Sequence, residues 1–147
     1  MKKPLYVYRP LLNGEDVVRW AKESGFKTVI DPSEMHVTIA YSRESVDWDQ
    51  FGDEMEYLSV LDNYSIKQFD GGATVLSFKS ALLHKRWQEF LDGGASWHYP
   101  EYQPHVTISY KAEDIFMSMI QPFRGVLQFG REVFKELDLN WKPSEEK

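Results

Sequence analysis

Two His-x-Thr triplets, His36-Val37-Thr38 and His105-Val106-Thr107, are the residues best suited to acid–base chemistry. The chain contains four His and four Thr, so about 0.1 such triplets are expected by chance. Side chains two apart on a strand share a face, so the imidazole and hydroxyl of each triplet should point the same way and the valine the opposite way. Each triplet therefore predicts a strand with one polar face and one face toward the core.

Two imidazoles at one site suit a reaction that needs a base at one oxygen and an acid at another, because His titrates near neutral pH. Cleavage of a phosphodiester makes this demand, since the attacking hydroxyl loses a proton and the leaving oxygen gains one. The Thr hydroxyls can donate to the phosphate oxygens between them. This chemistry needs no metal. The spacing of the other two histidines, His84 and His98, adds no tight ligand pair, so we predict neither a metal site nor a cofactor.

The elements that must position these triplets come in two similar copies. Each copy is expected to contain a strand, a helix and a second strand that carries the triplet. In the first copy these elements span 5–12, 14–24 and 35–41, and in the second copy they span 74–79, 81–92 and 105–110. We expect Asn13 and Ser80 to cap the two helices and glycines at 25 and 93–94 to end them. The two Arg-Trp pairs of the helices lie 67 residues apart and the triplets 69 apart, which indicates a duplicated unit.

These patterns predict an α+β fold. We expect duplicated strand–helix–strand lobes related by pseudo-twofold symmetry, with antiparallel sheets forming a central cleft and the helices packed outside. One domain should span 1–147, with lobes at roughly 5–70 and 71–140 and a frayed polar tail over 143–147. Further elements are expected as a strand over 58–69 that hairpins through Gly71-Gly72, a short helix over 113–119, and strands over 126–129 and 133–139.

Composition limits the classes of function. With 42% hydrophobic and 27% charged residues the chain is globular, and without cysteine it can form neither disulfides nor Cys-ligated metal sites. A net charge of -6 argues against binding to duplex nucleic acid, which requires neutralisation of phosphates. The chain has neither a run of 18 apolar residues nor a signal peptide, so we expect no membrane partner and a cytoplasmic location.

The two triplets, with the strand and helix before each, resemble the 2H phosphoesterase superfamily, which is named for two His-x-Thr/Ser motifs on paired lobes. Within it, residues 5–9, 11–13 and 35–42 look most like the phage anti-CBASS phosphodiesterases. Those enzymes destroy the cyclic di- and trinucleotide messengers of bacterial antiphage signalling.

The resemblance implies metal-independent hydrolysis of a 3′-5′ linkage in a cyclic oligonucleotide such as cyclic GMP-AMP, starting with attack by the neighbouring ribose 2′-hydroxyl. It gives the catalytic positions to His36, Thr38, His105 and Thr107, without deciding which His is base and which acid. It also implies aromatic side chains that stack on the bases, for which Tyr8 and Trp141 are the candidates. We expect a monomer in the cytoplasm, that of the host cell if a phage encodes it.

Two other functions fit the same residues. The substrate could be an RNA end with a 2′,3′-cyclic phosphate, or the protein could sequester a cyclic nucleotide without cleaving it.

Two further sets of residues, two tyrosines and five cations, have an expected place in the fold. We assign Tyr41 and Tyr110 to packing, because alternation places them on the valine face. Five cations could supply positive potential to a phosphate: Arg9, Lys67, Lys79, Lys111 and Arg124.

Overall fold

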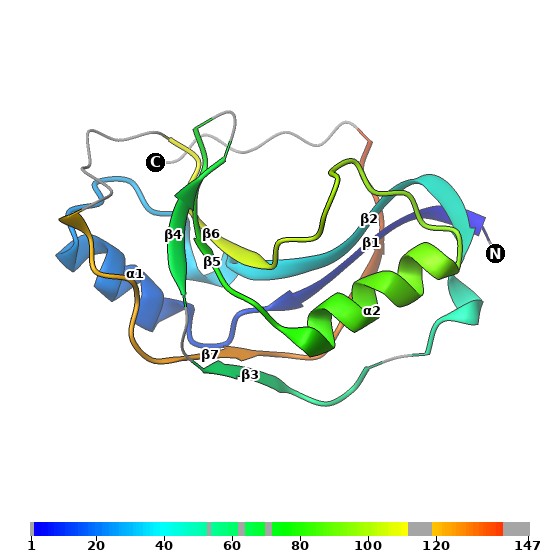
Figure 1. The fold of residues 1–147 in the computed structure, drawn as a ribbon, viewed down its shortest axis with the longest axis horizontal. Coiled ribbons are helices and arrows are strands. Elements are labelled where there is room, and N and C mark those ends of the chain that lie inside the picture. Colours follow the sequence, from blue (N-terminus) through cyan, green and yellow to red (C-terminus); the bar gives the residue numbers. More distant parts are fainter. Residues whose placement is uncertain (1, 53, 62–63, 70–71, 112–118, 140–147) are drawn as a thin grey trace.

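The computed structural model describes residues 2–52, 54–61, 64–69, 72–111 and 119–139. The described elements are two helices, two short 3-10 turns and eight strands, arranged as Figure 1 shows. In chain order they are β1 (Lys2–Pro10), α1 (Gly14–Glu23), η1 (Pro32–Glu34), β2 (His36–Asp47), η2 (Trp48–Gln50), β3 (Leu58–Leu61), β4 (Ser65–Gln68), β5 (Thr74–Ser77), α2 (Ala81–Asp92), β6 (His105–Ser109), β7 (Val126–Phe129) and β8 (Val133–Glu136).

A six-stranded antiparallel sheet is the centre of the fold. Its strand order is β4-β5-β6-β2-β1-β8, and β3 pairs with β7 in a separate two-stranded sheet. The two strands that carry the triplets, β2 and β6, are therefore neighbours at the middle, with β1 and β5 as their equivalent outer partners. The expected α+β class and the duplicated strand–helix–strand order are confirmed.

Both helices end in the same way, which extends the duplication to backbone hydrogen bonds. In α1 the N–H of Phe26 donates to the carbonyl of Ala21 and that of Gly25 to Lys22. The end of α2 repeats this pattern 69 residues later, at Ala95 and Gly94. Gly25 and Gly94 have φ values of 104° and 105°, in the left-handed region that glycine adopts without steric cost.

The core lies on one face of the six-stranded sheet. Buried side chains of β1, β2 and β6, such as Leu5, Ile39 and Ile108, pack in one cluster with Val17 of α1 and Phe90 of α2. Residues of β3 and β7 join the same cluster, and in Figure 1 these two strands run below the sheet while α1 and α2 flank it. Apolar burial on this face drives the sheet to present its opposite face, which carries the triplets, outward.

Each triplet strand contains a bulge at the equivalent position. Val7 pairs with Ala40 but Tyr8 with Thr38, so Ile39 is the extra residue on β2. Val75 pairs with Thr107 but Thr74 with Ser109, so Ile108, 69 residues later, is the extra residue on β6. A bulge interrupts the alternation of side chains along a strand.

Several sequence predictions differ from the structure; the strand expected over 35–41, for example, continues to Asp47. Residues 58–69 form two strands in different sheets, because Tyr64 lies between them with its hydroxyl 2.6 Å from the carbonyl oxygen of Val60. Asn13 makes no cap bond; its amide nitrogen donates to the carbonyl of Val126 in β7. The final strand ends at Glu136 instead of 139. Ser80 caps α2 through the N–H of Leu83, as predicted, and the helix expected over 113–119 lies almost wholly outside the described residues.

Candidate active site

The first catalytic candidate, His36, begins β2 directly after the η1 turn. Asp31 opens this turn by accepting a hydrogen bond from the N–H of Ser33. The turn places the carbonyl oxygen of Glu34 2.7 Å from Nδ1 of His36. A carbonyl only accepts hydrogen bonds, so Nδ1 carries the proton and Nε2 is the atom available for proton transfer.

The second candidate, His105, is held in the same way. It begins β6, and its Nδ1 lies 2.7 Å from the carbonyl oxygen of Gln103, again the residue two positions earlier. The pseudo-twofold symmetry thus extends to the tautomer of both rings. A fixed tautomer and ring orientation is what a proton-transfer imidazole needs.

The sheet register brings the two triplets together. Val37 pairs with Val106 across the antiparallel β2–β6 pair. Continuing this register by one residue sets His36 opposite Thr107 and Thr38 opposite His105. The two imidazoles are then diagonal neighbours on one face, with Cβ atoms about 7–8 Å apart. All four side chains are half-buried.

Both imidazoles are biased toward the neutral form. Burial lowers the pKa of His36 below its ordinary value, and the Glu34 carbonyl and carboxylate partly offset this shift. Burial also lowers the pKa of His105, and repulsion from His36 adds to the effect. This mutual repulsion disfavours double protonation, so a proton on one ring makes the other more difficult to protonate.

Tyr6 is a site residue that the sequence reasoning missed. Its hydroxyl lies 2.8 Å from Nε2 of His36 and is close to the side chain of Thr38. Burial raises the pKa of Tyr6 to about 12, so the phenol stays neutral. The signal was present in the sequence, because Tyr6 is two positions before Tyr8 on a strand and so shares its face.

Tyr8, which the sequence analysis proposed for base stacking, lies beside His36 and Tyr6. Its ring centroid is 5.4 Å from that of His36 and 5.1 Å from that of Tyr6. Tyr41 was wrongly assigned to packing: the bulge at Ile39 returns it to the His36 face, where its ring meets Tyr6 at 6.2 Å. Tyr110 packs against the core cluster, as expected, and it also lies close enough to Tyr6 to contribute to the raised pKa of that phenol.

The surroundings of His105 differ from those of His36. Phe69, which the sequence did not single out, meets the His105 ring edge-on with centroids 4.8 Å apart. Tyr8 pairs with Thr38, and the residue that pairs with Thr107 in the second lobe is Val75. The two lobes therefore share the His-x-Thr geometry but not the polar side chains around it.

The positively charged side chains around the site are not the set that the sequence predicted. Arg9 is 1% exposed on the core side, where it donates to the carbonyls of Glu56 and Gly130, so it supplies no charge to the triplets. Lys67 of β4 pairs with Val75 and is exposed. Lys135 of β8, which the sequence reasoning missed, pairs with Tyr6 and lies over the ring of Tyr8, 5.6 Å from its centroid.

Other candidates do not join the triplets. Trp141, the second predicted base-stacking residue, lies outside the described residues. His98 is exposed in a loop, with its ring centroid 6.5 Å from that of Tyr41. No group of three or more His, Asp or Glu side chains in the described part of the chain is placed to hold a metal ion. No described helix is long and apolar enough to cross a membrane.

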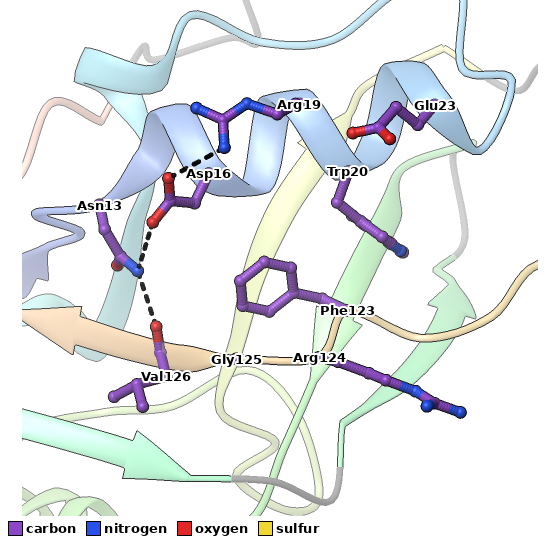
Figure 2. Close-up of a pocket in the computed structure, with 9 residues that line it drawn as sticks. All are labelled: Asn13, Asp16, Arg19, Trp20, Glu23, Phe123, Arg124, Gly125 and Val126. Atoms are coloured by element: carbon purple, nitrogen blue, oxygen red, sulfur yellow. Dashed lines mark hydrogen bonds and ion pairs between the residues drawn. The ribbon is translucent and has the colours of Figure 1, made fainter.

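A surface pocket of about 380 Å³ lies between α1 and residues 123–126 (Figure 2), and no triplet residue lines it. Its charges are mixed. Asp16 and Arg19 form an ion pair at 3.6 Å, and Glu23 adds a second carboxylate beside Trp20. Arg124, one of the predicted cations, also lines the pocket, so two guanidinium groups and two carboxylates balance and the pocket offers phosphate no net positive charge.

Comparison with known proteins identifies similar chains. A family model described as "Anti-CBASS protein Acb1" matches residues 3–144. A protein of that name from Sphingomonas paeninsulae is 44% identical over 97% of this chain, which spans only 24% of that relative's length. A protein of that name from Vibrio phage KVP40 is 27% identical over 86% of this chain and 82% of its own. Escherichia coli LigT, solved in complex with NADP+, shares the fold, with a TM-score of 0.67 and 13% identity over 99% of this chain and 94% of its own.

Proposed function

Because the chain belongs to the Acb1 family of anti-CBASS proteins, we propose that it is a metal-independent phosphodiesterase acting on cyclic di- and trinucleotide second messengers. It hydrolyses their 3′-5′ linkages and thereby evades bacterial CBASS antiphage immunity. It acts as a monomer in the host cytoplasm, with a cyclic oligonucleotide such as cyclic GMP-AMP as its partner.

One observation carries this proposal. The Nδ1 atoms of His36 and His105 are each held at 2.7 Å by the carbonyl two residues earlier, on adjacent strands of one sheet. This makes Nε2 the proton-exchanging nitrogen of each ring, on the sheet face that also carries Thr38 and Thr107; at His36 the Tyr6 hydroxyl bonds this nitrogen. A protein that only sequesters a nucleotide has no need for two imidazoles with matched tautomers, whereas an acid–base reaction does.

The chemistry follows from these groups. One neutral imidazole takes the proton of the ribose 2′-hydroxyl, whose oxygen attacks the adjacent phosphorus. The bond from phosphorus to the 5′-oxygen breaks, and the second imidazole, protonated at the start, supplies the proton that this oxygen gains. Thr38 and Thr107 donate to the non-bridging oxygens, where negative charge builds up. Water then opens the resulting 2′,3′-cyclic phosphate by the reverse sequence of proton transfers.

Substrate bases would stack beside this centre. Tyr8 is the supported candidate because its ring lies at the edge of His36 on the same face. Base stacking on an aromatic side chain contributes about 1–3 kcal/mol per base. Trp141 stays the second proposed stacking residue on the sequence pattern alone.

A substrate panel tests the proposal. Purified protein is incubated in EDTA with cyclic dinucleotides, cyclic trinucleotides and RNA ends bearing 2′,3′-cyclic phosphates, and the products are identified by mass spectrometry. We expect ring opening of cyclic oligonucleotides. Turnover of the RNA ends alone would identify an RNA 2′,3′-cyclic phosphodiesterase, and tight binding without products would identify a sequestering protein.

A deoxy analogue tests the nucleophile. A cyclic dinucleotide with hydrogen in place of the 2′-hydroxyl beside one phosphate should bind but resist opening at that linkage, because the intramolecular nucleophile is missing. The second linkage of the same molecule is the internal control. Equal rates of opening at both linkages would point to direct attack by water.

A further inference from the structure

The two imidazoles differ in what occupies Nε2. Each nitrogen has one in-plane direction for proton exchange. At His36 the Tyr6 hydroxyl fills this direction at 2.8 Å. At His105 no hydrogen bond to Nε2 is formed by any side chain or backbone group within the described part of the chain.

The sequence builds this difference into the two lobes. Tyr8 and Val75 hold equivalent places, because each pairs with the Thr of its triplet. Two positions earlier, Tyr6 in the first lobe corresponds to Ala73 in the second. A hydroxyl is therefore present at Nε2 of His36 and has no counterpart at His105.

The Tyr6 hydroxyl is suited to pass a proton on. With a pKa of about 12 it is protonated at any pH at which imidazole titrates, so it always has a proton to donate. Its second contact, with Thr38, places it next to the hydroxyl that we assign to the phosphate. Protonated His36 can return a proton to the phenol oxygen as the phenol proton leaves.

We propose that Tyr6 is the terminal proton donor, relaying the proton of His36 to the leaving 5′-oxygen, and that His105 is the general base. This inference rests on the proposed phosphodiesterase function. As the phosphorus–oxygen bond breaks, the 5′-oxygen takes the phenol proton, and the Nε2 proton of His36 restores the phenol. His36 ends neutral and His105 ends protonated with the proton of the 2′-hydroxyl. The charges balance, and the roles reverse when water opens the cyclic phosphate.

The charges around the two rings agree with these roles. The carboxylate of Glu34 attracts a proton to His36, whereas no carboxylate among the described residues does so at His105; the repulsion between the two rings is mutual and favours neither of them. The other titratable groups near this side are Tyr8, Tyr41 and Tyr110, which lie close to Tyr6, and Lys135 over Tyr8. None of these supplies a carboxylate that would favour protonation of His105.

A sulfur substitution separates acid from base. The probe is cyclic GMP-AMP with sulfur in place of one 5′-bridging oxygen, because a thiolate leaves without needing a proton. The protein variants are Tyr6→Phe, His36→Ala and His105→Ala, with Tyr57→Phe as the control for loss of a phenol hydroxyl on an exposed ring. Rates are measured at the oxygen and the sulfur linkage, and circular dichroism checks the fold of each variant.

We expect Tyr6→Phe and His36→Ala to lower kcat about a hundredfold or more at the oxygen linkage, as loss of a general acid does. At the sulfur linkage, the kcat of both variants should be within about tenfold of the kcat of the unsubstituted protein. His105→Ala should be impaired at both linkages. Combining Tyr6→Phe with His36→Ala should add little to either change, because both remove the same proton path.

Three results would overturn the inference. Rescue of His105→Ala by sulfur, without rescue of His36→Ala, would reverse the roles. A loss in Tyr6→Phe that sulfur does not restore would make Tyr6 a structural support only. An unchanged kcat in Tyr6→Phe would show that Tyr6 is not on the proton path. This test needs only the Tyr6→Phe variant, so it stays valid if His36→Ala fails to fold. Failure of the proposed function itself is seen separately, as absence of turnover at both linkages by the unsubstituted protein.

Discussion

At the scale of single residues, the site depends on two backbone carbonyls as much as on two imidazoles. The carbonyls of Glu34 and Gln103 decide which ring nitrogen carries the proton, and burial lowers the pKa of both rings. An imidazole with a lowered pKa releases its proton readily, which suits an acid, and is mostly neutral at pH 7, which suits a base. The same surroundings thus permit both roles, and the neighbours Tyr6 and Phe69 distinguish the two rings.

Removing either imidazole should abolish most of the activity without unfolding the protein. We expect His36→Ala and His105→Ala each to lower turnover about a hundred- to ten-thousandfold, the usual contribution of a general acid or base. The double variant should fall well short of the product of the two single effects. Steady-state kinetics on a cyclic dinucleotide checks this. More than about a third of normal turnover in either single variant, with substrate binding intact, would contradict the acid–base pair.

The pH dependence should be bell-shaped with its maximum on the acidic side. In the free protein kcat/KM rises with pH as the base loses its proton and falls as the acid loses its own. Both imidazole pKa values are lowered from 6.5, so both limbs should lie below that pH and kcat/KM should decline above it. A pH series from 5 to 9 measures the limbs. A flat profile, with chemistry shown to limit the rate, would be inconsistent with this pair.

At the scale of elements, bulges and turns set the direction in which the side chains of the site point. The extra residues Ile39 and Ile108 lie just after the triplets, and a bulge re-aims the residues that follow it. The η1 turn before β2 carries the Glu34 carbonyl and packs against the start of α1. At that contact Gly14 is buried, and a Cβ there would lie 2.7 Å from the carbonyl oxygen of Pro32.

The contact between α1 and η1 predicts a substitution effect. Gly14→Ala should lower the free energy of unfolding by about 1–3 kcal/mol, because backbone has to move to relieve the overlap. Turnover should fall as well, since the same turn holds the partner of His36. Gly52→Ala is the matched control, because a Cβ at Gly52 meets no atom within 4 Å. Urea unfolding compares the two variants, and equal stability would show that the turn adjusts without cost.

At the scale of the whole molecule, duplication places one triplet from each lobe at the centre of a single sheet. The match to the Acb1 family model confirms the resemblance to anti-CBASS proteins that the sequence indicated, and LigT shares the fold. Because each lobe supplies one imidazole and one hydroxyl, a complete site requires the β2–β6 pairing. Neither lobe alone holds both of the imidazoles that we propose as acid and base.

A site of this kind should work without a metal ion. We expect turnover of cyclic oligonucleotides to continue in excess EDTA, because the two imidazoles perform both proton transfers and the Thr hydroxyls bind the phosphate. The assay compares EDTA-treated protein with the same sample after addition of Mg²⁺, Mn²⁺ or Zn²⁺. Activity that disappears with EDTA and returns with one of these ions would refute the metal-independent mechanism.

The sequence by itself determined the repeated unit and the triplets, because both depend on local periodicity and spacing. It placed His36, Thr38, His105 and Thr107 on strands, predicted the helix ends at Gly25 and Gly94, and gave the α+β class. The sequence also contained the information needed to find Tyr6, because side chains alternate along a strand and Tyr6 therefore shares a face with Tyr8.

Only the tertiary structure decided which residues meet across the sheet. The pairing of Val37 with Val106, the bulge that turns Tyr41 toward the site and the approach of Lys135 to Tyr8 depend on strand register, which local sequence does not encode. The burial of Arg9 and the separation of β3 from β4 depend likewise on contacts between distant segments. Such contacts form only when the whole chain packs around one core, so no short stretch of sequence reveals them.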